Sequence, residues 1–279
     1  MFARISRSFD LIKASAAVLR GQGQLLLFPL IAGIAMTVIF ASFMLPLLLA
    51  HGAHGLGIRS SSPLTYSVGF AVYLVNYFVM FYFNTALVAC VMMLFDGGAP
   101  TVKDGLKAAN SRFGAILGYA VIAATVGMVL RAIQERLPFV GQLVVALVGA
   151  AWTVASFLVV PVLVAKNAGP IEAVRESALL VKRTWGENVA GQAGMGVAFG
   201  VIQFAIGLTA MLFIATAVSV GLEVLVLPIV ALLVLGVLGV MLVHTALSGI
   251  YSASLYRYAE RGDDGSFDGG VLRAAFVPK

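Results

Sequence analysis

Six long apolar runs divide this chain, each close to or above the length that crosses a lipid bilayer. A helix needs about twenty apolar residues to span the ~30 Å of hydrocarbon in a membrane. The runs lie at about residues 25–50, 64–95, 114–130, 142–165, 189–220 and 224–258. Only three residues separate the last two runs, which predicts an antiparallel hairpin. The pattern as a whole predicts an all-α polytopic membrane protein with six transmembrane helices.

Three shorter stretches between the runs, at about 1–20, 101–113 and 169–185, mix apolar and charged residues at helical spacing. In the third stretch, which begins at Pro170, the apolar positions are Ile171, Val174, Ala178, Val181 and Trp185. Such a helix has one apolar face and can lie in the headgroup layer of a membrane with that face in lipid. The sequence therefore predicts three amphipathic helices in addition to the six spans.

The order of these elements repeats. Each unit has one amphipathic stretch followed by two spans, at about 1–95, 100–165 and 169–258. An acidic residue stands three positions before a basic one in each short helix: Asp10 and Lys13, Asp104 and Lys107, Glu172 and Arg175. We interpret this pattern as a threefold internal repeat inside one integral membrane domain, residues 1–258, followed by a polar cytoplasmic tail at 259–279.

The composition agrees with a membrane class and excludes a soluble domain. Hydrophobic residues make up 61% of the chain and charged residues 11%, and the mean hydropathy is +1.03. The net charge of +6 does not indicate nucleic-acid binding, because basic connectors in a membrane protein account for it. Cys90 is the only cysteine, so an intrachain disulfide is excluded.

The distribution of basic residues predicts the orientation. Of the 18 Lys and Arg, 15 lie in the N-terminal arm, the two amphipathic connectors and the tail, and only Arg59, Arg131 and Arg136 lie in the opposite connectors. Basic connectors stay on the cytoplasmic side of a membrane. We therefore expect both termini and all three amphipathic helices in the cytoplasm.

Exposed basic residues on the amphipathic helices are candidates for contact with anionic lipid headgroups. The candidates are Arg7, Lys13, Lys103, Lys107, Lys182 and Arg183. A basic side chain near an anionic membrane surface contributes about 1 kcal/mol to binding. An equally good interpretation is that these charges only fix the orientation of the chain.

A few polar side chains fall inside the predicted spans, and they are candidates for buried polar contacts: Asn76, Asn84, Gln192, Gln203 and His244. They can line a path for a solute, or they can hydrogen-bond between helices. We favour the second interpretation, with His244 bonded to a carbonyl or hydroxyl near Thr245 or Ser248. The central parts of the spans hold no Asp, Glu, Lys or Arg.

The sequence has no motif for catalysis, for a cofactor or for a metal. A phosphate-binding loop, a zinc motif, a nucleophile elbow and paired catalytic carboxylates are all missing from it. We therefore expect a protein that is not an enzyme and that has no cofactor and no metal site.

Three segments carry a resemblance to known proteins: VPVLVAKNAGPIEAVRESALLVKRTW, LLLFPLIAGI and SLYRYAERGDDGSFDGGVLRAAFVPK. They resemble an uncharacterised family of bacterial six-span membrane proteins, similar in layout to YciC-type proteins and to the membrane domain attached to some glycerophosphodiesterases. The resemblance implies a six-helix membrane fold in a bacterial or archaeal cytoplasmic membrane. It implies no activity, and no catalytic residue can be carried across.

These observations favour a non-enzymatic structural or interaction protein of the inner membrane, which organises lipid or a partner through its cytoplasmic amphipathic helices. The expected partners are membrane lipids and a second copy of the chain or another membrane protein, without nucleic acid. The alternative is a channel or transporter for a small neutral or apolar solute, which would need a continuous path past His244 and the amides.

Overall fold

The computed structural model of the chain describes residues 2–51 and 63–261, with side chains placed at 12–43, 45, 67–184 and 191–260. Every regular element in this described part is a helix. The helices are α1 (Phe2–Gly21), η1 (Gly23–Leu26), α2 (Leu27–His51), α3 (Pro63–Phe95), α4 (Val102–Ser111), α5 (Phe113–Gln134), α6 (Phe139–Ala155), α7 (Val159–Ala165), α8 (Pro170–Arg183), α9 (Trp185–Ser219), η2 (Glu223–Leu225) and α10 (Val226–Arg261).

Six helical segments of the described chain are long and apolar enough to cross a membrane. They are Gly23–Phe43, Ser67–Phe95, Phe113–Gln134, Phe139–Ala165, Gly191–Ser219 and Glu223–Glu260. Each overlaps one of the six runs found in the sequence, so the prediction of an all-α chain with six helices of this length and apolar character is confirmed for the described residues. The predicted tail lies outside the described residues from position 262 onward.

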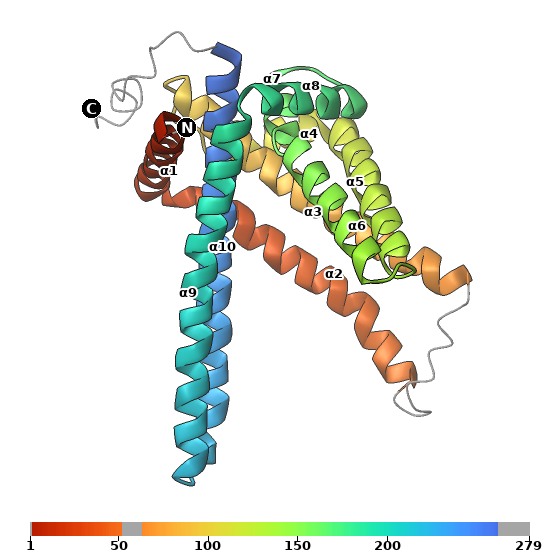
Figure 1. Ribbon diagram of the computed structural model, residues 1–279, viewed down its shortest axis with the longest axis vertical. Coiled ribbons are helices and arrows are strands. Elements are labelled where there is room, and N and C mark those ends of the chain that lie inside the picture. Colours follow the sequence, from red (N-terminus) through yellow and green to blue (C-terminus); the bar gives the residue numbers. More distant parts are fainter. Residues whose placement is uncertain (1, 52–62, 262–279) are drawn as a thin grey trace.

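The short helices gather at one end of the molecule, and the long helices run away from it. Figure 1 shows α4, α7 and α8 together at the top, with α1 beside the upper part of the hairpin formed by α9 and α10. Below this level, α2 and the α9–α10 hairpin diverge, while α5 and α6 stay together. We call the region of α4, α7, α8, the last turns of α3 and residues 246–260 of α10 the packed end.

Most of the buried side chains lie in the packed end. On α10, the segment from Ala246 to Ala259 is buried almost throughout, whereas no residue from 226 to 245 is. Tyr251 and Leu255 of this segment pack with Leu158 and Leu163, which lie in and just before α7. A second cluster joins α1, α2, α3 and α4 around Phe28 and Leu87. The core therefore sits at one end of the helices rather than along their length.

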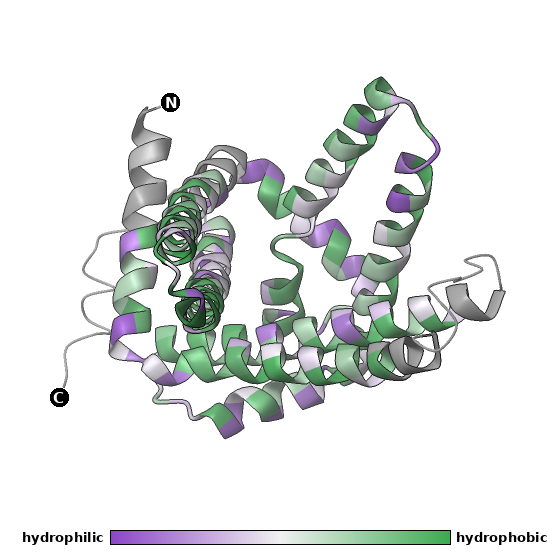
Figure 2. Cartoon of the chain, turned by 90° about the horizontal axis from the view of Figure 1, so that it is seen from below, coloured by the Kyte–Doolittle hydropathy of each residue, from purple (hydrophilic) through white to green (hydrophobic). Residues whose placement is uncertain are grey.

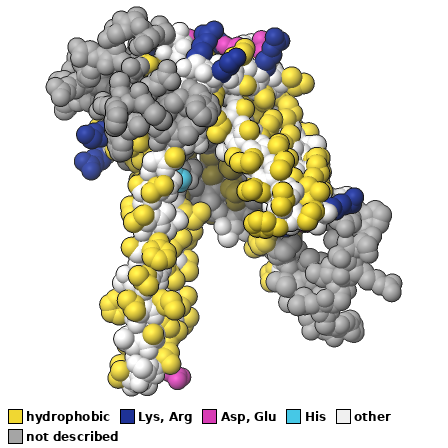
Figure 3. All heavy atoms as spheres, in the orientation of Figure 1, with side chains coloured by type: hydrophobic (Ala, Val, Ile, Leu, Met, Phe, Trp, Pro, Cys, Tyr) yellow, Lys and Arg dark blue, Asp and Glu magenta, His cyan; other side chains and the backbone are white. Residues whose placement is uncertain are grey.

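The α9–α10 hairpin is largely exposed beyond the packed end. Phe204 is 72% exposed and Leu227 is 78% exposed. The two helices, viewed nearly end-on in Figure 2, are coloured mostly as hydrophobic, and Figure 3 shows an open space between the hairpin and the rest of the molecule. Because lipid tails are as apolar as leucine, a membrane can cover these side chains without a protein partner.

Two glycines with positive φ end long helices. Gly97 (φ +82°) follows α3, and the amides of Gly97 and Gly98 donate to the carbonyls of Leu94 and Met93. Gly221 (φ +77°) makes the turn between α9 and η2. Only glycine adopts this backbone conformation without strain, so both positions fix where a helix stops.

The fourth span is broken, contrary to the continuous helix predicted at 142–165. The chain leaves the helix between Ala155 and Val159, and Pro161 in α7 lacks the N–H that would continue it. The buried Ser177 of α8 closes the break, because its Oγ donates to the Ala155 carbonyl (2.6 Å) and accepts from the Leu158 amide (3.0 Å). A side chain from another helix thus satisfies the freed backbone groups.

Helix α4 begins with a capping box and packs through a glycine. Thr101 Oγ1 accepts from the Asp104 amide (3.4 Å), and Asp104 Oδ2 accepts from the Thr101 amide (2.9 Å). A methyl group on Gly105 would lie 2.6 Å from the Ala86 carbonyl oxygen and 2.6 Å from Cys90 Sγ. Only glycine therefore permits α4 to lie so close to α3.

Candidate functional site

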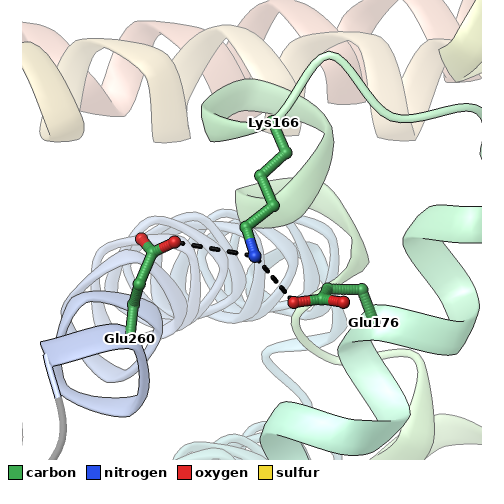
Figure 4. A network of polar contacts seen from close by, with 3 residues as sticks. All are labelled: Lys166, Glu176 and Glu260. Carbon is green, nitrogen blue, oxygen red and sulfur yellow. Dashed lines mark hydrogen bonds and ion pairs between the residues drawn. The ribbon is translucent and has the colours of Figure 1, made fainter.

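A charged cluster joins three elements of the packed end. Lys166, directly after α7, places its Nζ 2.6 Å from Glu176 Oε1 of α8 and 3.6 Å from Glu260 Oε1 of α10 (Figure 4). The hydrogen bond to Glu176 raises the pKa of Lys166 above its usual value, with a further contribution from Glu260. The three side chains are between 33% and 48% exposed, so the cluster orients the helices more than it stabilises them.

A buried hydroxyl lies next to this cluster. Tyr256 is 2% exposed and stands one helical turn before Glu260 on α10. Its hydroxyl makes no hydrogen bond of standard geometry to a described residue, although it lies beside Glu260.

A second ion pair fixes the same end of α10. Arg257 Nη1 lies 3.1 Å from Asp96 Oδ1, just after α3, and the guanidinium carbon of Arg257 is 5.4 Å from the centre of the Phe95 ring. Arg257 is only 21% exposed, and a cation over an aromatic ring adds a modest attraction. The end of α10 is therefore tied to α3 on one side and, through Lys166, to α7 and α8 on the other.

The predicted headgroup candidates are exposed wherever the structure places them. They are Lys13 of α1, Lys103 and Lys107 of α4, and Lys182 and Arg183 of α8. The side chain of the sixth candidate, Arg7, lies outside the described residues. Figure 3 shows Lys and Arg side chains, with some Asp and Glu, at the packed end at the top of that view.

The buried face of α8 overlaps only in part with the face that the sequence pattern predicts to lie in lipid. Ala173, Ser177, Leu180 and Val181 are buried against other helices. Val181 belongs to the predicted lipid face, whereas Ile171, from the same predicted face, is 75% exposed. The helix therefore packs on the protein through Ala173, Ser177, Leu180 and Val181 and leaves Ile171 uncovered.

The five polar candidates inside the spans are half-buried and lie in different surroundings. Asn76 donates from Nδ2 to the Val72 carbonyl of its own helix (2.8 Å), and Asn84 borders Gly249 of α10. The remaining candidates are Gln192 and Gln203 on α9 and His244 on α10.

His244 makes a contact that the sequence does not reveal. Its ring centre lies 4.8 Å from that of Phe199 on α9. Thr245, which we expected near the imidazole as a hydrogen-bond partner, donates to the Met241 carbonyl instead. The pairing of His244 with Phe199 depends on the register of the hairpin, which spacing within one helix cannot give.

The sequence has GxxxG patterns at Gly114–Gly118 and Gly196–Gly200, and of these four glycines only Gly118 lies at a close helix contact. A methyl group on Gly114, Gly196 or Gly200 would meet no described atom within 4 Å. Gly105 lies against α3, and a methyl group on Gly118 would lie 2.8 Å from the Pro170 ring. In the sequence, the capping-box pattern of Thr101 and Asp104 indicates where α4 begins. No pattern in the neighbouring residues indicates that Gly105 contacts α3.

A metal centre is not present among the described residues, where no three His, Cys, Asp or Glu side chains are close enough to hold an ion. The cluster of Lys166 with Glu176 and Glu260 has two carboxylates, but the lysine ammonium occupies the space between them (Figure 4). The site as a whole is an arrangement of charges that positions helices.

Comparison with known proteins identifies a family over most of the chain. Residues 64–267, from the start of α3 to beyond the end of α10, match the family described as "Family of unknown function (DUF6159)". No curated protein and no solved structure matches the chain. None of these comparisons connects it with YciC-type proteins or with glycerophosphodiesterase-associated domains. The chain belongs to the DUF6159 family, whose function is unknown.

Proposed function

We propose that this chain is a non-enzymatic structural or interaction protein of a bacterial or archaeal cytoplasmic membrane, which binds anionic lipid headgroups at its packed end. One observation carries the proposal. Lys103, Lys107, Lys182 and Arg183 are all exposed, and their two short helices lie at the same end of six apolar helices. A surface of this kind attracts anionic headgroups at about 1 kcal/mol per basic residue.

The experiment compares charge reversal at the two ends of the molecule. Lys182→Glu with Arg183→Glu should lower the retention of phosphatidylglycerol by the purified protein, by up to roughly 30-fold for two residues at about 1 kcal/mol each. Arg131→Glu with Arg136→Glu is the matched control, because both arginines are exposed at the opposite connector. Native mass spectrometry counts the retained lipids. Equal loss in both double variants would contradict a headgroup site on α8.

The orientation is part of the proposal: both termini and the three short helices lie in the cytoplasm, following the excess of Lys and Arg. In a Cys90→Ala background, a cysteine at Gln134, after α5, should react with an impermeant thiol reagent added outside intact cells. A cysteine at Ser111 should not. Both side chains are exposed, so access to the protein surface is matched. Labelling at Ser111 and not at Gln134 would show that the orientation is the reverse of the one we propose.

The threefold repeat also belongs to this proposal, and the order of the helices supports it. A short helix precedes two spans three times: α1 before α2 and α3, α4 before α5 and α6, and α8 before α9 and α10. In the second repeat unit the acidic residue is Asp104, which takes part in the capping box at the start of α4. Glu172 lies in the first turn of α8, where a negative charge favours the helix dipole.

A channel or transporter for a small neutral or apolar solute is the alternative, and the contacts of the polar candidates give it less support. Asn76 bonds within α3, and His244 packs on Phe199. If His244 bound a solute, His244→Ala would abolish flux in liposomes while the protein kept its thermal stability. If the imidazole only packs, the variant should show no flux phenotype.

A further inference from the structure

We propose that the charged turn between α5 and α6 thins the bilayer, because it draws the membrane surface opposite the packed end toward the protein core. We call this membrane surface the far surface. Tyr119 of α5 and Tyr251 of α10 belong to one cluster of buried residues. From this cluster, α5 and α10 both extend toward the far surface (Figure 1). The two helices differ in how far they run before they reach a charged residue.

The charges on α5 lie much closer to the core than those of the α9–α10 hairpin. On α5 the first Asp, Glu, Lys or Arg is Arg131, 12 residues from Tyr119, or about 18 Å of helix. Toward the hairpin tip it is Glu223, 28 residues from Tyr251, or about 42 Å. A tilt of 40°, the upper end of the usual range, shortens 42 Å only to about 32 Å along the membrane normal. In Figure 1 the turn between α5 and α6 accordingly lies well above the hairpin tip.

A flat far surface at the level of the α5–α6 turn would leave the outer part of the hairpin in water. The part beyond that level is about residues 204–238, and it holds sixteen large apolar side chains that are each 38–79% exposed. Exposed apolar patches on proteins in water rarely exceed a few hundred Å². This arrangement is therefore unfavourable.

A flat far surface at the hairpin tip would instead place the α5–α6 turn in hydrocarbon, roughly 14–24 Å below that surface. Arg131 and Glu135 form an ion pair there (3.1 Å), whereas Arg136 has no ion-pair partner among the described residues. Charged side chains within hydrocarbon are costly. A far surface that reaches both the turn and the tip avoids both costs, and this requires a thinner bilayer at α5 and α6.

Thinning of this kind is within the known response of lipid. A bilayer thins around a hydrophobic segment that is too short for it, at a modest cost per ångström. The chain would thus act on lipid at the side opposite the headgroup site on α8. This inference shares with the proposed function only the location of the chain in a membrane, and it uses no residue of α4 or α8.

The test measures the depth of two spin labels in bilayers of phosphatidylcholine. Each label is attached to a single cysteine, at Gln134 or at Leu235, in the full-length Cys90→Ala chain. Both positions are exposed, and they lie 15 and 16 residues from Tyr119 and Tyr251, respectively. Collisions with oxygen and with a water-soluble nickel chelate report the depth of each label.

The label at Leu235 should lie roughly 14–18 Å deeper than the label at Gln134, because Leu235 is 12 residues from Glu223. Equal depths would overturn the proposal. Two labels near the far surface would mean that the hairpin projects into water. Two deep labels would mean that the α5–α6 turn lies in hydrocarbon.

A triple variant tests the role of the charges: Arg131→Leu, Glu135→Leu and Arg136→Leu. The label at Gln134 should then move several ångströms deeper, because the turn no longer needs a polar surface. The matched control is Glu223→Leu at the hairpin tip, which should leave that label in place. An unchanged depth in the triple variant would overturn the proposal.

The outcome is independent of the lipid-retention experiment. Phosphatidylcholine carries no net charge, and none of these variants changes a basic residue of α4 or α8. A headgroup site on α8 can therefore be refuted while the difference in depth remains, and the reverse also holds.

Discussion

The packed end and the part of the α9–α10 hairpin beyond it are built from similar apolar residues. Of these two regions, the packed end has a protein core and the hairpin is largely exposed. Leu255 is fully buried in the packed end, whereas Leu235 on the same helix is 65% exposed. The packed end also contains the serine that closes the broken span and the charged residues that tie α10 to α3, α7 and α8. Polar contacts and close-packed glycines, rather than hydrophobicity, therefore determine where the helices adhere to one another.

The largest difference between the regions should appear when leucine is truncated in each. Leu255→Ala should lower stability by about 2–5 kcal/mol, because it leaves a cavity in a closed core. Leu235→Ala should change stability by less than about 0.5 kcal/mol, because lipid fills the space. Thermal unfolding of the purified variants measures both. Similar losses would show that the hairpin has a packed partner along its length.

Glycine substitution tests the close contact of α4 with α3. Gly105→Ala should lower stability by about 1–3 kcal/mol, because its methyl group would meet the Ala86 carbonyl and Cys90 Sγ. Gly114→Ala, at the start of α5, has open space around it and should be neutral or slightly stabilising. The same unfolding assay ranks the two variants. A neutral Gly105→Ala variant would mean that α4 can move away from α3 at little cost.

Ser177 tests how much a single hydroxyl contributes to the packed end. Ser177→Ala removes the partner of the Ala155 carbonyl and the Leu158 amide, and an unpaired buried polar group costs about 1–3 kcal/mol. Ser111→Ala removes an exposed hydroxyl that donates to the Ala108 carbonyl of its own helix, and it should cost far less. Chemical unfolding in mixed micelles compares them. Equal stabilities would show that water or the backbone itself satisfies the break.

Removing the charge of Asp104 or of Lys166 should have the smallest effect on stability. The contribution of Asp104 is lost at low pH, whereas that of Lys166 is lost at high pH. The hydrogen bonds from Thr101 lower the pKa of Asp104, so its contribution to α4 is present above pH 3.8 and lost as the pH falls further. The pKa of Lys166 is raised, so its contribution is complete below pH 10.5 and lost only at higher pH. Lys166→Met should thus differ from wild type by a constant amount, below about 1 kcal/mol, between pH 5 and 9. A difference that varies within this interval would contradict the prediction.

The sequence predicts the six spans well because local features determine them: the hydropathy of each run, and the glycine and proline residues at the helix ends. The glycines at 97 and 221 and the proline at 170 mark helix boundaries within a few residues of the predicted ones. Local patterns do not tell lipid-facing from protein-facing apolar residues, since both environments are apolar. For this reason the pattern places Val181 in lipid, although it is buried, and does not indicate the contact of His244 with Phe199. The break at Ala155 is closed by a residue 22 positions away, which no local pattern reports.

The closure of the fourth span by Ser177 has a consequence for the synthesis of the protein. The Ala155 carbonyl and the Leu158 amide emerge from the ribosome before the serine that pairs them. Until α8 arrives, a bilayer offers these groups no water and no partner. We therefore expect insertion of the fourth span to be coupled to the docking of α8. A nascent chain that stops between residues 165 and 177 would present the insertion machinery with an unfinished span.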